Sequence, residues 1–426
     1  MVKKGSKYYE KEIEAEIGRV SSSFPYSTIK GLKVKARLYS LSFTELCCNV
    51  MTSLSYRKSA QMLNRFFNRA TESLVKHRTL KDFALSLGSS IDKTIMDETN
   101  QVLIEHGFDK DTGLPKDMTL LSESITNPYM EEDVSLTHEA RLSTLEEYNA
   151  LFKEEEKKKL NDMEYCIACE KAPSSCVYIS VDDIGVKHQK DSRSDGYIKE
   201  QKTVRNTVIH IACDSRHYII TAYGMDKAFR ILISFLLKNE LMENREVVFL
   251  TDGANDIRCA IERFFAFRPY AIYLDWYHVK KKCKEFLSQA IKGSAKSKKA
   301  IIKHVLDLLW RGKIDDIIAY LDGFKSSCIK NEDKKAEMKD CLNRKRAYIP
   351  CYAFRAFLGL INSSNRVEKA NDLVVGQRQK HNGMSWVPEG SSSLAIIKAC
   401  TLNKENDVWT NSKTIRFSLL DSAKAA

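Results

Sequence analysis

The sequence predicts an α/β protein in which a β-rich middle lies between two helical regions. Apolar residues recur at helical spacing from Phe43 to Met96 and again across 279–361, whereas short runs of β-branched and aromatic residues mark the segment between them. Only 17 Gly and 7 Pro occur among 426 residues, which argues against a loop-rich all-β chain or a disordered one. The length suits two to three domains, and the 43% hydrophobic content is enough for a core.

The helical front predicts a compact three-helix region. Residues 1–40 form a polar N-terminal arm, with a short helix predicted at Tyr9 to Ile17, and residues 41–105 carry helical patterns broken near 53–55 and 68–73. Ser55 is placed to cap the second of these helices. Three helices with short turns fit a DNA-binding helix-turn-helix unit, although any small helical bundle shows the same stripes.

Basic residues on the polar faces of this region favour the DNA-binding interpretation, with a merely solvated face as the alternative. They are Arg57, Lys58, Arg65, Arg69, Lys76, His77, Arg78 and Lys81.

A connecting region spans residues 106–164. It begins as a loop over 106–135 and continues as an exposed linking helix over 139–164, whose Glu154 to Lys159 block offers ion pairs one turn apart. The Cys166-x-x-Cys169 pair that follows could bind zinc together with Cys176 and His188, but only this one pair has ligand spacing and a structural zinc site needs four well-placed ligands. The twelve cysteines, scattered irregularly, are better explained as buried thiols in a reducing cytosol.

The middle segment, 165–278, reads β-β-β-α-β-α-β. Its elements are a strand at 177–182, a hairpin of strands at 203–213 and 217–223, a helix at 229–241, a strand at 247–252, a helix at 255–265 and a strand at 270–275. Residues 279–362 are helical and basic, 363–400 contain a further helix that begins near Arg366, and 401–426 form a C-terminal tail.

Charge and missing motifs narrow the function classes. The formal net charge is 68 − 56 = +12, which modestly favours a polyanionic partner. No apolar stretch is long enough to span a membrane, and the N-terminus does not resemble a secretory signal. The phosphate-binding loop, the His-Glu-x-x-His pair and the Gly-x-Ser-x-Gly elbow are all missing from the sequence.

Acidic residues at strand ends are the strongest remaining chemical signal. Asp182 and Asp252 each follow an apolar strand. Carboxylates at the ends of adjacent strands repel each other unless a divalent cation lies between them, and two such cations support phosphoryl transfer. The alternative is that each Asp forms a turn or caps a helix. Glu368 is the third candidate, although Asn365 and Glu368 also have the spacing of a capping box.

Several segments together resemble the DDE transposases of bacterial insertion sequences, and in particular their ISLre type, often catalogued as an uncharacterised protein family. They are Phe249–Ala254, Leu274–Lys280, Asn365–Lys369, Gln377–Trp386 with Gly390, and the helix-turn-helix-like Ser55–Ala60. The resemblance covers about residues 41 to 400. It implies an RNase H-like fold with a helical insertion before the last catalytic helix.

The resemblance also implies the site. Asp182, Asp252 and Glu368 match the three catalytic acids, which hold two Mg²⁺ or Mn²⁺ ions. Asp183 adjoins Asp182, and because neighbours on a strand point to opposite faces, only one can enter the site; we choose Asp182. Asp275 and His278 match an Asp-x-x-His element that either positions DNA near the metals or makes a structural hydrogen bond.

Basic residues after these motifs are predicted phosphate contacts, again with a solvated face as the alternative. They are Lys280, Lys281, Lys282, Lys284, Arg378, Lys380 and His381. Trp386 either stacks on an unpaired base or, as we expect, packs in the core.

The resulting hypothesis is a metal-dependent transposase in the bacterial cytoplasm, associated with the nucleoid and with no membrane partner. It would cleave double-stranded DNA at the ends of its element and join the freed 3′ ends to target DNA, as a homodimer or larger assembly because two ends must meet. The alternatives are a structure-selective nuclease of the same fold and a DNA-binding derivative whose catalytic core is inactive.

Overall fold

A computed structural model describes residues 11–15, 18–22, 32–34, 37–67, 75–126, 138–151, 153–154, 157, 176–189, 203–243, 245–380 and 384–421. The strands are β1 (Lys11–Ala15), β2 (Gly18–Ser22), β3 (Leu32–Val34), β4 (Arg37–Tyr39), β5 (Cys176–Lys187), β6 (Thr203–Cys213), β7 (Arg216–Tyr223), β8 (Glu246–Thr251), β9 (Ala271–Leu274) and β10 (Leu420–Asp421).

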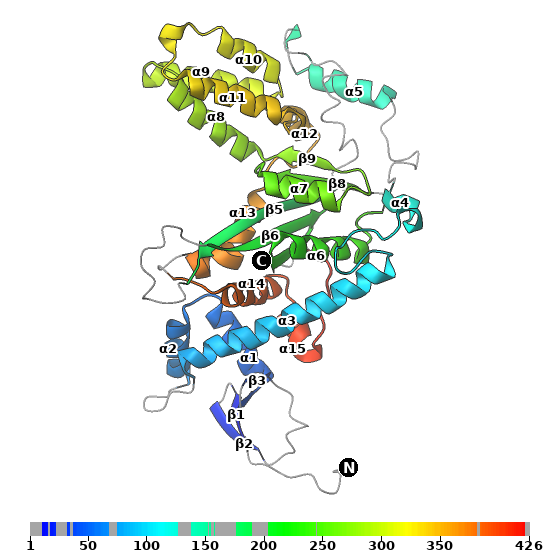
Figure 1. Cartoon of the computed structure of the whole chain (residues 1–426), viewed down its shortest axis with the longest axis vertical. Helices are drawn as coiled ribbons and strands as arrows, with labels where there is room; N and C mark the ends of the chain where they lie inside the picture. Colours follow the sequence, from blue (N-terminus) through cyan, green and yellow to red (C-terminus); the bar gives the residue numbers. More distant parts are fainter. Residues whose placement is uncertain are drawn as a thin grey trace.

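The helices alternate with the later strands and dominate both ends of the chain (Figure 1). They are α1 (Leu41–Met51), α2 (Tyr56–Phe66), α3 (His77–Glu105), α4 (Glu123–Thr126), α5 (His138–Asn149), α6 (Met225–Lys238), α7 (Asn255–Phe264), α8 (Trp276–Ala290), α9 (Ala295–Trp310), α10 (Ile314–Asp322), α11 (Glu332–Arg344), α12 (Tyr352–Phe357), α13 (Asn365–Asn371), α14 (Pro388–Leu402) and α15 (Asn406–Ser412). A π-helix, η9 (Asp372–Lys380), follows α13, and single 3₁₀ turns lie at η2 (Met118–Leu120), η7 (Ser326–Cys328) and η8 (Arg346–Tyr348).

A mixed six-stranded sheet forms the centre of the molecule (Figure 1), in the order β10-β7-β6-β5-β8-β9. The strand β6 runs antiparallel to both of its neighbours, β5 and β7. The strand β8 runs parallel to both of its neighbours, β5 and β9. The predicted order β-β-β-α-β-α-β is confirmed element by element from β5 to β9. The α/β class is therefore confirmed.

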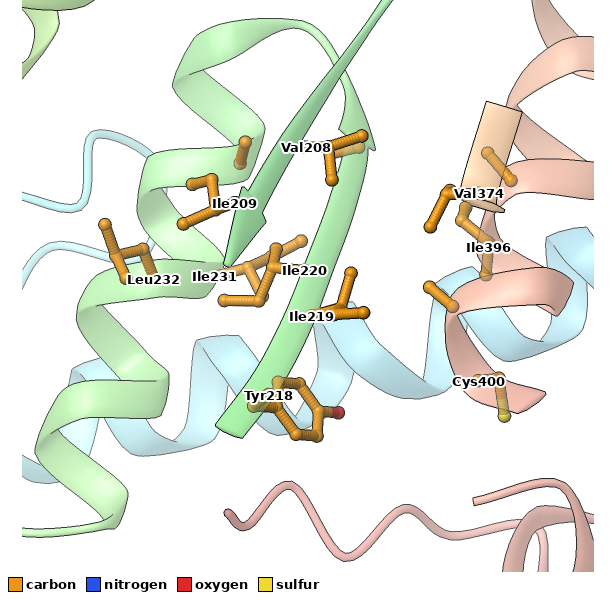
Figure 2. Close-up of a cluster of buried hydrophobic side chains, with 14 of the residues drawn as sticks. Val208, Ile209, Tyr218, Ile219, Ile220, Ile231, Leu232, Val374, Ile396 and Cys400 are labelled. Atoms are coloured by element: carbon orange, nitrogen blue, oxygen red, sulfur yellow. The ribbon is translucent and has the colours of Figure 1, made fainter. Parts of the chain in front are cut away.

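Helices cover both faces of the sheet at β6 and β7, and the side chains of these strands point alternately toward one helical layer and the other (Figure 2). Ile209 and Ile220 lie on the same side as Ile231 of α6, whereas Val208 and Ile219 point toward the side of α14. Alternation with period two thus supplies apolar surface to both layers, as in a strand covered on each face.

The front helices pack onto this core through α3. Ser55 caps α2 as predicted, accepting a hydrogen bond of 3.3 Å from the Lys58 N–H. The long helix α3 then contacts both α6 and α14. At its crossing with α14, Gly88 lies so close to Ser393 that a Cβ on Gly88 would be 2.4 Å from the Ser393 Cβ. The region predicted as a helix-turn-helix unit is therefore continuous with the α/β core through α3.

The rear helices α8 to α11 form a lobe with its own apolar cluster. Figure 1 places this lobe toward one end of the long axis and α1 and α2 toward the other, above β1 and β2, with the large sheet between the lobe and these two helices. The predicted helical character of 279–362 is confirmed. Within the described residues, no helix combines the length and hydropathy that a bilayer crossing requires.

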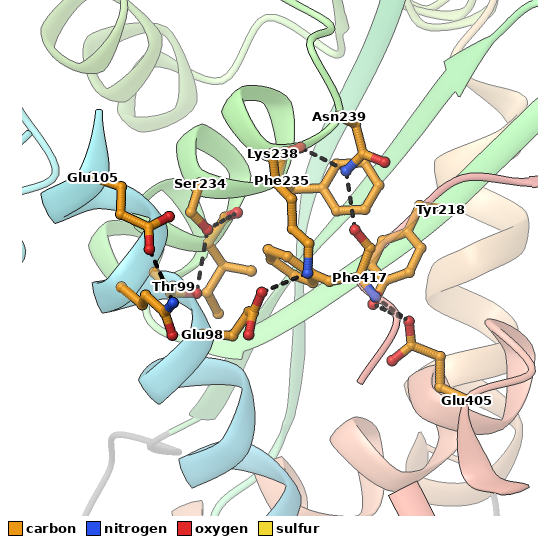
Figure 3. Close-up of polar contacts among 12 residues, drawn as sticks. Glu98, Thr99, Glu105, Tyr218, Ser234, Phe235, Lys238, Asn239, Glu405 and Phe417 are labelled. Atoms are coloured by element: carbon orange, nitrogen blue, oxygen red, sulfur yellow. Dashed lines mark hydrogen bonds and ion pairs between the residues drawn. The ribbon is translucent and has the colours of Figure 1, made fainter. Parts of the chain in front are cut away.

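The C-terminal residues belong to the core. Phe417 is 1% exposed, and β10 pairs with β7 at the edge of the sheet. Figure 3 shows Glu405 beside Tyr218 and Phe417. The Glu405 carboxylate accepts hydrogen bonds from the Tyr218 hydroxyl at 3.1 Å and from the Phe417 N–H at 2.9 Å. Burial raises the pKa of Glu405.

Two secondary-structure predictions at the front are wrong. The helix predicted at Tyr9 to Ile17 is replaced by β1, which pairs with β2 and β4 in a small second sheet, because an isolated amphipathic turn gains less than a closed ladder of backbone hydrogen bonds. The predicted linking helix over 139–164 ends at Asn149, where Ala150 and Leu151 form a turn. Most of its charged block, Glu154 to Lys159, lies outside the described residues.

Candidate active site

Asp182 and Asp252 occupy equivalent positions on adjacent parallel strands. Ser180 of β5 pairs with Leu250 of β8, and each Asp lies two residues beyond its member of that pair. Asp182 still belongs to β5, whereas β8 ends at Thr251, so that Asp252 begins the following loop. Parallel pairing therefore brings two carboxylates, 70 residues apart in the chain, to the same edge of the sheet.

The neighbouring acids Asp182 and Asp183 face opposite sides of β5. Asp182 accepts a hydrogen bond of 2.5 Å from Asn371 Nδ2 of α13. Asp183 accepts one of 2.6 Å from the hydroxyl of Thr207, its partner on β6. Only Asp182 therefore lies on the face that α13 covers, where Glu368 is also located.

Like charges make this edge electrostatically strained. Burial, followed by repulsion from Asp252, raises the pKa of Asp182 to about 6. Asp252 itself is exposed and accepts a 2.8 Å hydrogen bond from the Ala254 N–H across Gly253. A glycine is required between them because its φ is +84°.

Asp275 joins this edge to the helix that carries Glu368. It is fully buried, caps α8 by accepting a 2.9 Å hydrogen bond from the His278 N–H, and also accepts one from the Ser364 N–H just before α13. Although burial opposes ionisation, the His278 side chain and these two backbone N–H groups lower the pKa of Asp275 to about 2. Of its two predicted roles, this placement fits the structural one.

His278 lies among all the acids of the site. Its Nδ1 is 3.3 Å from Asp275 Oδ1, and its Nε2 is 3.4 Å from Glu368 Oε1. Asp275, then Glu368 and Asp252, raise the pKa of His278, and the imidazole in turn interacts electrostatically with Asp182. His278 therefore contacts Glu368 directly and interacts electrostatically with both Asp182 and Asp252.

Glu368 lies on the first turn of α13, where its side chain is 41% exposed. The predicted capping box is wrong in detail, because α13 begins at Asn365 itself and Ser364 is its N-cap, with no side-chain capping bond. Glu368 is therefore not used in capping. Its one described ion-pair contact is with His278.

A lysine of the rear lobe also reaches the site. Lys345, at the carboxyl end of α11, donates a 2.9 Å hydrogen bond to the Gly253 carbonyl, next to Asp252. Burial and the nearby Lys282 lower the pKa of Lys345. A cavity of about 30 Å³ between α8 and α11, enough for one water, has Asp252, His278 and Lys345 in its lining.

The donor chemistry of this edge suits a divalent cation. Three carboxylates offer hard oxygen ligands of the kind that Mg²⁺ and Mn²⁺ prefer, and burial together with repulsion from Asp252 disfavours the ionised form of Asp182 when no cation is bound. As placed, no three His, Cys, Asp or Glu side chains of the described residues are close enough to share one ion. Binding would therefore require the flexible Glu368 or Asp252 side chains to move inward.

The predicted DNA contacts divide into exposed and buried residues. Arg57, Lys58 and Arg65 are exposed on α2, and Lys281 is exposed on α8 beside a half-buried Lys280. Lys282, Lys284 and Lys380 are also exposed. The seven exposed side chains, all except that of Lys280, are accessible to a polyanion.

Arg378 is a correction. It is 3% exposed, donates a 2.9 Å hydrogen bond to the Met51 carbonyl, and lies 5.0 Å from the ring centroids of both Tyr56 and Trp386. Its guanidinium therefore joins η9 to α1 and α2 and does not face solvent. Trp386 packs in the core, as expected, at 6% exposed.

Three predicted candidates cannot be placed. His381 and the possible zinc ligands Cys166 and Cys169 lie outside the described residues.

Two residues of the site were missed from the sequence. Asn371 has a signal that could have found it, because it lies one helical turn after Glu368 and so on the same face. Lys345 has none, because it is 92 residues from Gly253 and reaches it only through the packing of the rear lobe.

Comparisons with known proteins leave the chain without an assigned family. No family model matches it, and no curated protein matches its sequence. Among solved structures, the Drosophila P element transposase strand transfer complex aligns over 89% of this chain and 89% of that chain, at 11% identity and a TM-score of 0.20.

Proposed function

We propose that this protein is a metal-dependent DNA transposase of the DDE class, similar to the ISLre type, that cleaves and joins DNA strands. The observation that carries the proposal is the convergence of Asp182, Asp252 and Glu368 on His278 at one edge of the sheet. These acids come from β5, the loop after β8, and α13, separated along the chain by 70 and 116 residues. Acids that served only to cap a helix or form a turn would have no reason to lie close to one another.

The order of the strands supports an RNase H-like core. Three antiparallel strands, β7-β6-β5, continue into the parallel strands β8 and β9, with α6 and α7 as the crossover helices. The pairing of β5 with β8 places Asp182 and Asp252 side by side. Glu368, the third acid, comes from α13, which packs on β5 and β6 on the face opposite α6.

The distribution of charge supports DNA as the substrate. Residues 279–361 contain 20 Lys and Arg against 9 Asp and Glu, a net charge of 20 − 9 = +11, whereas the whole chain has +12. Nearly all the excess positive charge therefore lies in the rear lobe, beside the acids. A duplex crossing this edge would meet α8 on one side and, at the far end of the molecule in Figure 1, the exposed arginines of α2.

Asp182, Asp252 and Glu368 are the residues that would hold the cations. A bound pair of Mg²⁺ ions stabilises both the attacking and the leaving oxygen of a phosphoryl transfer. In that arrangement Asp275 fixes α13 against α8, and His278 accepts or donates a proton at Nε2 beside Glu368. Lys345 places one more positive charge beside the loop of Asp252.

Replacing Asp252 tests the catalytic assignment. We expect Asp252→Ala to reduce Mg²⁺-dependent or Mn²⁺-dependent cleavage of plasmid DNA carrying the genomic flanks of the coding sequence by at least 10³-fold, because one of the acids that positions the cations is lost. DNA binding, measured by fluorescence anisotropy, should change less than threefold.

Asp183→Asn is the matched control, since Asp183 is the neighbouring acid on the opposite face and Asn still accepts the hydrogen bond of Thr207. It should retain wild-type cleavage. Full cleavage by Asp252→Ala would overturn the assignment, and a wild-type protein that cuts branched DNA but joins no 3′ ends would instead be a structure-selective nuclease. A protein that binds DNA but neither Mg²⁺ nor Mn²⁺ would be an inactive derivative.

A further inference from the structure

Asn371 places a side-chain amide directly against Asp182. Its Nδ2 donates a 2.5 Å hydrogen bond to Asp182 Oδ2, and the residue is 6% exposed. It is the last residue of α13, one turn after Glu368, and the π-helix η9 begins at the next residue. Irregular helix of this type is frequent at functional sites.

The other amide atom of Asn371 is an unused acceptor. Asn371 Oδ1 is buried and has no hydrogen-bond partner among the described residues. Rotating the amide by half a turn would not remove the problem, because it would point Oδ1 at the ionised Asp182 and break the bond from Nδ2. An orphaned buried carbonyl oxygen costs about 1–3 kcal/mol, so a side chain kept in this state is expected to have a further ligand.

The surroundings indicate which ligand. The oxygen belongs to the amide group whose Nδ2 bonds Asp182, and repulsion from Asp252 acts on that same carboxylate, so this neutral oxygen donor lies close to negative charge. A hydrogen-bond donor from a substrate base would equally satisfy an amide oxygen. The adjacent carboxylates favour a cation instead, because amide and carboxylate oxygens are the mixed donor set that Mg²⁺, Mn²⁺ and Ca²⁺ accept.

We propose that Asn371 is a fourth protein ligand of the cation site, with Oδ1 coordinating a divalent cation held by Asp182 while Nδ2 keeps the Asp182 carboxylate oriented. The proposal rests on the proposed function, since it assumes that Asp182 holds a cation. It goes beyond the three predicted acids by adding a neutral oxygen donor.

Calorimetric titration of the full chain with Mn²⁺ alone, without DNA, tests the proposal. Asn371→Leu has nearly the same shape and no polar atoms, and we expect it to weaken Mn²⁺ binding at least tenfold. Asn371→Asp keeps an oxygen donor and adds a negative charge beside Asp182. We expect it to bind Mn²⁺ at least as tightly as the wild type while its metal-free form unfolds at a lower temperature.

Asn371→Asp is thus expected to keep or raise Mn²⁺ affinity while it lowers the stability of the metal-free protein. A residue with a merely structural role would not give both effects. Asn371→Leu with wild-type Mn²⁺ affinity would overturn the proposal, and so would Asn371→Asp with an affinity as weak as that of Asn371→Leu, because only the N–H donor would then matter. Asn371→Ala repeats the measurement if the leucine variant does not fold. Wild-type protein that binds no Mn²⁺ would instead contradict the proposed function itself.

Discussion

At the scale of single residues, the site is built around one repulsion. Asp182 accepts a hydrogen bond from Asn371 and is repelled by Asp252. Asp275 follows β9, on the other side of β8 from β5, and it stays ionised because the His278 side chain and two backbone N–H groups interact with its carboxylate. Two carboxylates at one sheet edge thus have pKa values near 6 and near 2. Their hydrogen-bond partners, and not burial alone, set this difference.

Asp182→Asn should therefore stabilise the metal-free protein. A carboxyl whose pKa is about 6 when folded and about 3.9 when unfolded contributes stability below pH 4, and that contribution is lost as the pH rises through 6. Removing the charge should raise the free energy of unfolding at pH 8 by about 1–2 kcal/mol and leave it unchanged or lower at pH 4.

Thermal unfolding at the two pH values, with EDTA present, checks this expectation. The same variant should lose the stabilisation that Mn²⁺ gives the wild type, because a carboxylate ligand has been removed. Equal melting temperatures for the variant and the wild type at pH 8 would show that Asp182 is not strained by its neighbours.

At the scale of elements, the sequence predicted strands and helices well wherever an apolar period was long. The strands β5 to β9 and the helices α6 and α7 follow the patterns closely, because each is covered on one or both faces by the same core. The termini were harder to predict. Leu420 and Asp421 form an edge strand only because β7 offers them a partner, and two residues carry no detectable period.

The candidate site was predictable in part for the same reason. The positions of Asp182 and Asp252 follow from strand ends, but the pairing of β5 with β8 that brings them together depends on tertiary structure. The burial of Arg378 between Tyr56 and Trp386 could not be read from its charge. Arg378 lies over the rings of Tyr56 and Trp386, and such cation–π contacts depend on how the chain folds.

The crossing of α3 and α14 is expected to be intolerant of added volume. Gly88→Ala would place a methyl group 2.4 Å from the Ser393 Cβ and 2.6 Å from its Cα, so the helices must separate. We expect the free energy of unfolding to fall by about 2–4 kcal/mol, measured by urea denaturation. Ser89→Ala, at the exposed neighbouring position, is the control and should change it by less than about 0.5 kcal/mol.

At the scale of the whole molecule, charge is distributed unevenly. The rear lobe contains +11 of the net +12 and lies at one end of the long axis, while the exposed basic residues of α2 lie at the other (Figure 1). The acids lie between these two surfaces. A long polyanion could therefore contact both ends while a phosphate approaches the acids.

Lysines of the rear lobe should act through the DNA backbone. Lys281→Ala together with Lys284→Ala removes two exposed cations of α8, and we expect the slope of log affinity against log salt to become shallower by about 2. Lys93→Ala together with Lys116→Ala, two exposed lysines of the front half, is the charge-matched control. Equal slopes for both double variants would show that the rear lobe does not bind DNA.

The hydrogen bonds that join Glu405 to Tyr218 and Phe417 have a consequence for synthesis of the protein. Because these contacts close the sheet beside β7, the core cannot be completed until residues near 417 have emerged from the ribosome. A nascent chain already holding all three acids would still lack this closure. The proposed DNA cleavage would therefore be withheld from unfinished polypeptides, and a stop codon shortly before Phe417 should leave an unstable product for cellular proteases.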